Sequence, residues 1–232
     1  MDVEVARDGK LYSLHFEKGE NVGGLLKIET TSKKTYSVQK WRPDLDVFTD
    51  INIPLEFFTE TLKRQAIVNA GLTFILYDET PEGTQKYEFC YPEGISGYVT
   101  EVADGKNETS VQYIEAERTG RDRADKEDYK VKMQAAFCFA PTNTMIEFYH
   151  NSSFLEYGGV HDAATKTAFV YAIDKYIKQT GKYSKNESKI TFNDISDCLI
   201  LVISSFSTLV SYEHQTKKAV NNPFIKEALT DF

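Results

Sequence analysis

The chain has 232 residues, of which 41% are hydrophobic and 27% are charged, and its formal net charge is −8. This composition fits a globular protein with one large or two small domains, and it excludes a disordered or membrane-embedded chain. The negative charge argues against a strong free-standing nucleic-acid binder, because non-specific affinity for phosphates depends on clustered Lys and Arg.

Neither the N-terminus nor any apolar stretch predicts export or membrane insertion. No apolar run approaches the roughly 18 residues of a spanning helix, and the first residues lack the pattern of a signal peptide. We therefore expect a cytoplasmic protein. The cysteines occur singly and the histidines lack metal-ligand spacing, so we expect buried free thiols and no metal site among Cys90, Cys138, Cys198, His15, His150, His161 and His214.

The chain begins with a pattern typical of half-buried strands. Residues 11–16 and 35–41 alternate between apolar and polar side chains. Between them we expect a turn through Gly19 and Gly23-Gly24, and Pro43 ends the pattern.

A helix and a hairpin are predicted next. Residues 54–69 have Pro54 at a first-turn position and Gly71 just past the end. One face of this helix carries Leu55, Phe58, Leu62 and Ala66. Residues 72–77 and 86–91 then predict two paired strands across a Pro-Glu-Gly turn.

Basic and acidic residues alternate between residues 116 and 132. A mixed run of this kind usually forms a solvated loop or a strand edge, and a DNA-facing arm is the alternative. Residues 131–139 and 145–150 then predict two further strands around a turn at 141–143.

The longest predicted helix begins near Gly159 and ends at Gly181. Its apolar stripe consists of Val160, Ala164, Phe169, Ala172, Ile173, Tyr176 and Ile177. Thr191 and Asp194 have capping-box spacing, which predicts a short helix ending near Leu199. A buried strand at 200–203 and a polar loop at 214–218 follow. Helices and strands intermix throughout, so the fold class is predicted to be α+β.

Short motifs follow one another in a characteristic order along the chain. They are WRPDLDVFTD at 41–50, LKRQAIVNAGL at 62–72, EGISGYV at 93–99, GGVH at 158–161 and HQTK at 214–217. In this order and spacing they resemble the motifs of type IIA topoisomerase B subunits, those of DNA gyrase and topoisomerase IV. Ala70 departs from the resemblance, because that family usually has proline there.

The resemblance covers nearly the whole chain and implies its domain organisation. Residues 1–40 resemble the C-terminal strands of a GHKL ATPase domain, and residues 41–232 resemble a transducer domain of the ribosomal S5 domain 2-like fold. That fold implies a left-handed βαβ crossover around the helix near Gly159, against the general preference for right-handed crossovers. The family's catalytic glutamate, Mg-binding asparagine and ATP lid have no counterpart here, so we do not expect this chain to hydrolyse ATP alone.

The resemblance also implies the function and the partners. A transducer couples ATP binding and hydrolysis to DNA strand passage, in a protein that uses ATP and Mg and acts with a topoisomerase A subunit and DNA. The family dimerises through its ATPase domain, so the isolated chain is expected to be a monomer. These motifs leave open whether the chain comes from gyrase, from topoisomerase IV or from a divergent paralogue.

The resemblance assigns roles to a few residues. Lys217 would contact the terminal phosphate of ATP and Gln215 would assist, while Lys166 keeps a basic, DNA-facing position of the family. A positioned ammonium stabilises the charge that develops in phosphoryl transfer, so Lys217→Ala is expected to slow ATP hydrolysis. Gly158 and Gly159 are interpreted as structural, and His161 as a histidine hydrogen-bonded to a neighbouring loop.

Departures from the family pattern fall where DNA contact would be expected. Tyr171, Ser196 and Phe206 stand in place of basic residues, which implies fewer phosphate contacts and a flatter salt dependence. Two other classes of protein are alternatives. One is the second domain of a MutL-like GHKL protein, and the other is a free-standing S5-like nucleic-acid-binding module.

Overall fold

The computed structural model describes residues 1–29 and 34–232, which divide into two units, Met1–Pro54 and Leu55–Phe232. No helix within these described residues is long and apolar enough to cross a membrane. The domain boundary predicted after residue 40 rests on the resemblance and stays a prediction.

The first unit is an antiparallel sheet in the strand order β3-β2-β1-β4. Its strands are β1 (Asp2–Arg7), β2 (Lys10–Glu17), β3 (Glu20–Glu29) and β4 (Tyr36–Lys40). The strands predicted at 11–16 and 35–41 are confirmed. The predicted turn is confirmed at Gly19, between β2 and β3, but is wrong at Gly23-Gly24, because β3 continues through both glycines while its register against β2 shifts between Ser13 and His15.

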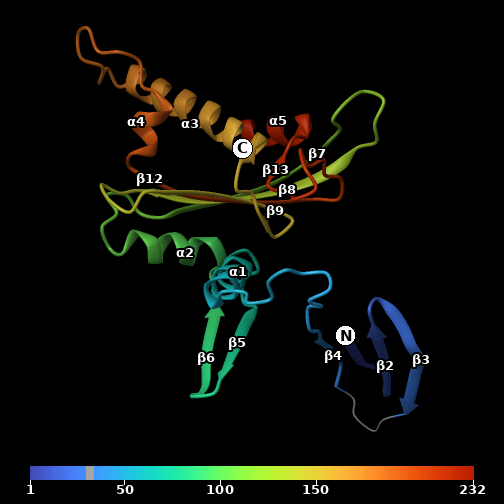
Figure 1. Ribbon diagram of the computed structural model, residues 1–232. Helices are drawn as coiled ribbons and strands as arrows, with labels where there is room; N and C mark the ends of the chain where they lie inside the picture. The colour runs from blue at the N-terminus through green and yellow to red at the C-terminus, as the bar shows by residue number, and fades with distance from the viewer. Residues whose placement is uncertain (30–33) are drawn as a thin grey trace. The chain divides into compact units, whose positions relative to one another are not determined.

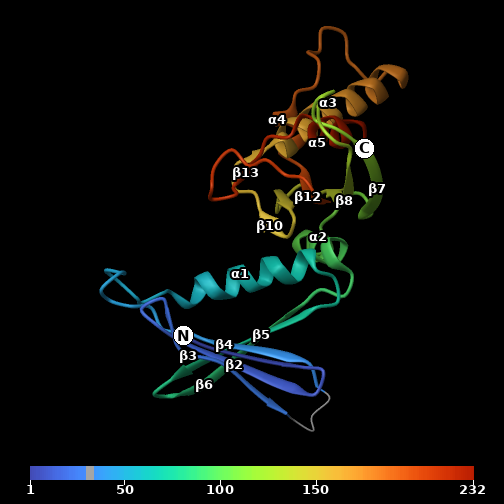
Figure 2. The same cartoon turned by 90° about the vertical axis from the view of Figure 1, so that its right-hand side faces the viewer.

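The second unit begins with α1 (Leu55–Val68) and the antiparallel hairpin of β5 (Thr73–Thr80) and β6 (Gly83–Cys90). Both predictions are confirmed, and α1 lies over the hairpin (Figure 2). The following helix α2 (Gly94–Ala103) was not predicted, since its two glycines lower helix propensity. Burial of Ile95, Tyr98 and Val99 along one face supplies the stabilisation that local propensity lacks.

A five-stranded sheet forms the centre of the second unit, in the order β10-β9-β12-β8-β7. Its strands are β7 (Gln112–Gly120), β8 (Tyr129–Phe139), β9 (Met145–His150), β10 (Ser153–Phe154) and β12 (Leu199–Ser207). The central strand β12 is antiparallel to β8 and parallel to β9. The connection from β9 to β12 contains α3 (Val160–Gln179) and α4 (Phe192–Ser196), and so forms a βαβ unit. Its predicted left hand stays a prediction.

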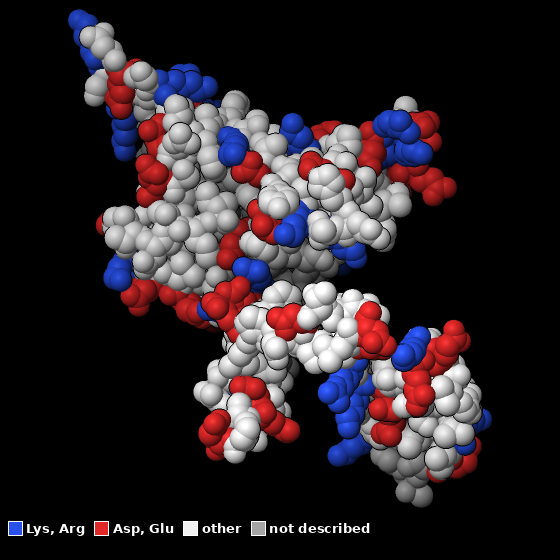
Figure 3. Space-filling view, viewed as in Figure 1, with Lys and Arg blue, Asp and Glu red and all other residues white. Residues whose placement is uncertain are grey.

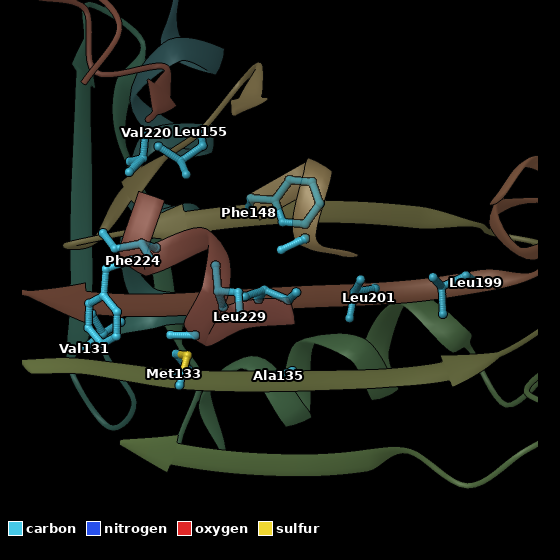
Figure 4. Packing of buried hydrophobic residues seen from close by; sticks show 14 of the residues in the cluster. Val131, Met133, Ala135, Phe148, Leu155, Leu199, Leu201, Val220, Phe224 and Leu229 are labelled. Carbon is cyan, nitrogen blue, oxygen red and sulfur yellow. The ribbon is translucent and has the colours of Figure 1, made fainter. Parts of the chain in front are cut away.

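Helices cover both faces of this sheet (Figure 1). On one face Leu199, Leu201 and Ile203 of β12 pack with α3, α4 and the C-terminal helix α5 (Pro223–Asp231), in the core that Figure 4 shows. On the other face Ile200 and Val202 pack with α1 and α2. An uninterrupted apolar run is what a strand buried on both faces requires. The predicted α+β class is confirmed.

Three finer predictions fail in the second unit. The predicted apolar stripe of α3 includes Ala172 and Tyr176, but both side chains are exposed, Tyr176 by 56%. The capping box is present, with the Thr191 amide donating to Asp194 Oδ2 at 2.8 Å, but α4 ends at Ser196. Cys138 is buried as expected, whereas Cys90 is exposed at the end of β6. Alternation and caps locate elements, but the exposure of one side chain depends on what packs beside it.

The mixed-charge segment joins β7 to β8, and most of its ion pairs are internal, while Arg118 pairs with Asp231 of α5. Arg121 forms an ion pair with Asp128 at 2.6 Å, and Lys130 pairs with Glu117 across the two strands at 2.6 Å. Figure 3 shows blue and red side chains mixed over this hairpin. The pairing agrees with the interpretation as a solvated loop and strand edge.

Candidate functional site

The polar loop after β12 is closed at its base by backbone hydrogen bonds. Tyr212 and Val220 form an antiparallel bridge, and the amide of Glu213 donates to the carbonyl of Ala219 at 3.0 Å. The amide of Asn221 donates to the carbonyl of Ser211, also at 3.0 Å. We call residues 211–213 and 219–221 the neck of this loop, and residues 214–218 its tip.

A third segment is attached to the neck. The short strand β11 (Gly158–Gly159) pairs in parallel with β13 (Ala219–Val220), and α3 begins at the next residue, Val160. Gly158 and Gly159 have φ of +66° and +61°, and a Cβ on Gly159 would lie 2.3 Å from the carbonyl oxygen of Val220. The prediction that both glycines are structural is therefore confirmed. The glycine pair fixes the neck directly to the start of α3.

Buried histidines lie behind the neck. His161, in the first turn of α3, contacts Ser205 Oγ through Nε2 at 2.6 Å. His150, at the end of β9, contacts the same oxygen through Nδ1 at 2.8 Å and Ser207 Oγ through Nε2 at 3.0 Å. The Ser207 hydroxyl donates to the carbonyl of Leu209 at 2.6 Å. The expected partner of His161 was a neighbouring loop, so that detail is wrong: its partner belongs to strand β12.

These hydrogen bonds have one consistent direction. A carbonyl only accepts, so Ser207 donates to Leu209 and must itself accept from Nε2–H of His150. Burial lowers the pKa of His150 to about 4 and that of His161 to about 3, so both rings are neutral near neutral pH. Neutral His150 then accepts at Nδ1 from Ser205, which accepts from Nε2–H of His161. The chain of donors runs from α3 to the segment that leads into the neck.

Lys217 and Gln215 lie together on the exposed tip. The Lys217 backbone is left-handed, with φ of +58°, and its amide donates to the carbonyl of His214 at 3.0 Å. Its Nζ lies 5.9 Å from the ring centre of Tyr212, and no carboxylate within the described residues forms an ion pair with it. Lys218 differs, because it forms an ion pair with Glu156. The two adjacent lysines are therefore not equivalent.

Lys166 lies elsewhere, in the second turn of α3. Its Nζ pairs with Asp162 at 2.7 Å and lies 5.8 Å from the ring centre of Phe192 on α4. The structure thus brings Gln215 and Lys217 together on one loop and places Lys166 at the contact between α3 and α4. The roles assigned to all three stay predictions.

Sequence reasoning did not single out Tyr212 or the link from His150 to Ser205. The two linked residues are 55 positions apart, so no local pattern connects them. Tyr212 could have been noticed only as an aromatic residue close to a predicted functional lysine.

Residues 94–232 match the family model of DNA gyrase B. This match covers more than half of the chain. The chain belongs to the DNA gyrase B family. The match favours the topoisomerase resemblance over the MutL-like and free-standing S5-like alternatives.

Relatives of this gyrase B family chain come from both kinds of enzyme. The DNA topoisomerase 4 B protein of Enterococcus faecalis is 26% identical over 230 residues, which are 97% of this chain and 32% of that protein. The DNA gyrase B protein of Mycoplasmoides gallisepticum is 27% identical over 236 residues, 97% of this chain and 35% of that protein. The chain thus spans about a third of the length of these curated relatives.

Solved structures share the fold. The 43K ATPase domain of Thermus thermophilus gyrase B has a TM-score of 0.74 at 23% identity. The match covers 99% of this chain and 60% of the chain of that domain. The topoisomerase IV ATP-binding domain of Francisella tularensis has a TM-score of 0.73 at 25% identity, with coverages of 99% and 61%. The mixed α+β fold of this gyrase B family member is therefore that of gyrase B ATPase-region structures.

Proposed function

We propose that this chain is the transducer region of a type IIA topoisomerase B subunit and couples ATP binding and hydrolysis to DNA strand passage. One observation carries the proposal: the neck of the Gln-Thr-Lys loop is paired with the two glycines from which α3 starts. A ligand that moves the loop therefore acts directly on the longest helix of the second unit.

Lys217 and Gln215 are the proposed contacts to the terminal phosphate of ATP. The Lys217 ammonium is exposed and has no carboxylate partner in the described part of the chain, so it fits an anionic group. ATP with Mg would be held chiefly by a GHKL ATPase domain, of which residues 1–40 would form the last strands. Transfer of the terminal phosphoryl group develops charge on its oxygens, and a fixed ammonium stabilises that charge.

The second unit would move as a rigid body when ATP binds at the tip of the loop, and would thereby transmit nucleotide binding to the rest of the protein. Its sheet is covered by helices on both faces, and packed cores shift between discrete arrangements rather than deforming continuously. We assign this unit to the ribosomal S5 domain 2-like fold, with the left-handed crossover at the β9–α3–β12 connection. The parallel pairing of β9 with β12 supports the assignment.

DNA and a topoisomerase A subunit are the proposed partners, in a cytoplasmic homodimer that forms through the ATPase domain. Lys166 is the predicted DNA-facing residue. Lysines are also frequent at the end of α3 and in the segment that follows it, where blue side chains lie among red and white ones (Figure 3). These lysines are Lys175, Lys178, Lys182, Lys185 and Lys189. Asp174 pairs with Lys178 and Lys189, whereas Lys175 and Lys182 lie over the rings of Tyr171 and Tyr176, which leave their charge available to phosphates.

The test compares two adjacent lysines in a longer chain that joins this one to its ATPase domain. Lys217→Ala should lower kcat for ATP hydrolysis on the order of 100-fold while changing nucleotide affinity little, because the contact strengthens in the transition state. Lys218→Ala is the matched control and should hydrolyse ATP at nearly the unmodified rate. Equal, unmodified rates for both variants at saturating ATP would refute the phosphate contact.

A further inference from the structure

Tyr212 lies between the exposed tip and the buried histidines. The Nζ of Lys217 lies 5.9 Å from the centre of its ring. The ring centre is 6.4 Å from that of His150, and the two rings are arranged edge to face at 74°. His150 is fully buried and held at both ring nitrogens by Ser205 and Ser207. The ring of Tyr212 therefore contacts the buried, hydrogen-bonded ring of His150 on one side and faces the exposed side chain of Lys217 on the other.

The backbone around Tyr212 is fixed as well. Its bridge to Val220 closes the neck, and Val220 packs beside Leu155 in the core (Figure 4). A lysine side chain has many rotamers, so an exposed ammonium needs a partner to stay in one place. The face of an aromatic ring attracts a cation within about 6 Å, which meets that need without neutralising its charge.

We propose that Tyr212 is a positioning residue for Lys217: its ring, seated on His150, holds the ammonium in the orientation that meets the terminal phosphate. This inference rests on the proposed function of Lys217. Tyr212 is not expected to touch the nucleotide. Lys218 is oriented differently, by Glu156 and by the ring of Tyr157 at 5.5 Å from its Nζ.

The experiment is a double-mutant cycle on ATP hydrolysis in the chain joined to its ATPase domain. Tyr212→Leu removes the ring, and Tyr212→Phe keeps the ring but loses the hydroxyl, which interacts with Ser153. Each is made alone and together with Lys217→Ala, and single-turnover assays give the rates of the slow variants. Far-UV circular dichroism and thermal unfolding show that each variant is folded.

The proposal expects Tyr212→Leu to lower kcat on the order of 3-fold with KM unchanged, the size of one exposed cation–π contact. Tyr212→Phe should keep the unmodified rate. In the Lys217→Ala background, Tyr212→Leu should have no further effect, because the group it positions is gone.

Other outcomes overturn it. An equal loss of hydrolysis rate from Tyr212→Leu in both backgrounds would mean that Tyr212 acts independently of Lys217. An unchanged rate in both backgrounds would mean that Tyr212 has no role in hydrolysis. A loss in Tyr212→Phe as large as that in Tyr212→Leu would assign the effect to the hydroxyl. If Lys217→Ala itself hydrolyses ATP at the unmodified rate, the proposed function fails and this inference fails with it.

Discussion

The neck and the tip belong to one loop but are fixed by different forces. The neck contains Val220, which is buried, and it pairs with glycines that admit no side chain. The tip is exposed, and a turn hydrogen bond from Lys217 to His214 and side-chain contacts to the rings below hold it. Backbone pairing positions the neck, while the side chains of the tip stay exposed and can contact a ligand.

This difference predicts how substitutions divide between stability and turnover. Changes behind or within the neck should lower the free energy of unfolding of the second unit, because they disturb buried groups. Changes at the tip should leave that free energy almost untouched while altering ATP hydrolysis.

The largest expected effect is acidification, which acts on the buried histidines behind the neck. The folded pKa values of His150 and His161, about 4 and about 3, lie below the ordinary 6.5. Between these values the unfolded chain binds more protons, so stability falls as pH decreases below about 6.5. When the pH falls from about 7.5 to about 5, each histidine should lower the free energy of unfolding by about 2 kcal/mol, and the two together by about 4 kcal/mol.

Urea unfolding followed by far-UV circular dichroism at the two pH values measures this loss. The first unit provides an internal control, because the hydrogen bond to Asp2 raises the pKa of His15 and gives its effect the opposite sign. The single tryptophan, Trp41, lies in the first unit and reports its unfolding by fluorescence. His150→Gln should reduce the pH dependence of the second unit by about half. A second unit equally stable at both pH values would contradict the neutral, buried histidines.

The next effect is expected at the glycine that holds the neck. Gly159→Ala should lower the free energy of unfolding by about 3 kcal/mol, because it combines a strained backbone with a steric clash. The backbone has φ of +61° and ψ of −127°, and the new Cβ would meet the Val220 oxygen at 2.3 Å. The comparison would be made by urea unfolding.

Gly181→Ala is the matched control. Gly181 has nearly the same φ, +63°, but no atom of the described residues lies within 4 Å of the added Cβ. The backbone penalty alone should cost about 1 kcal/mol. Equal losses in the two variants would show that the contact between Gly159 and Val220 contributes nothing.

The smallest effects on stability are expected at the tip. Lys218→Ala removes a solvent-exposed ion pair with Glu156, and such pairs contribute little. Lys217→Ala removes no ion pair among the described residues, so its urea midpoint should match that of the unmodified chain, although its ATP hydrolysis in the longer chain is expected to be slow. A clear loss of stability in Lys217→Ala would mean that the tip, like the neck, contributes to the stability of the fold, and would contradict the proposed difference between them.

The elements with strong local patterns could be predicted, and those stabilised mainly by burial could not. The α1 helix, the β5–β6 hairpin, α3 and the central strand have clear periodicity or terminal signals and are confirmed. Helix α2 has glycines at its first and fourth positions, and the packing of Ile95 and Val99 stabilises it. The prediction of a turn at Gly23-Gly24 is wrong because strand pairing overrides the local signal of the two glycines. Val22 and Leu26, on either side of the glycines, pair with β2 and keep the segment in one strand, in which the glycines lie at a bulge.

The amino-acid sequence by itself determined the α+β class, the order of most elements, and the motifs that resemble type IIA topoisomerase B subunits. Those properties depend on residues near one another in the chain. Only the tertiary structure decided that Gly159 meets Val220, that His150 and His161 share Ser205, and that Tyr212 lies beneath Lys217. Most of these contacts join positions far apart in the chain, and even the neighbouring Tyr212 and Lys217 meet only because the neck closes. No periodicity encodes them, since long-range pairing depends on how the sheet and its helices pack.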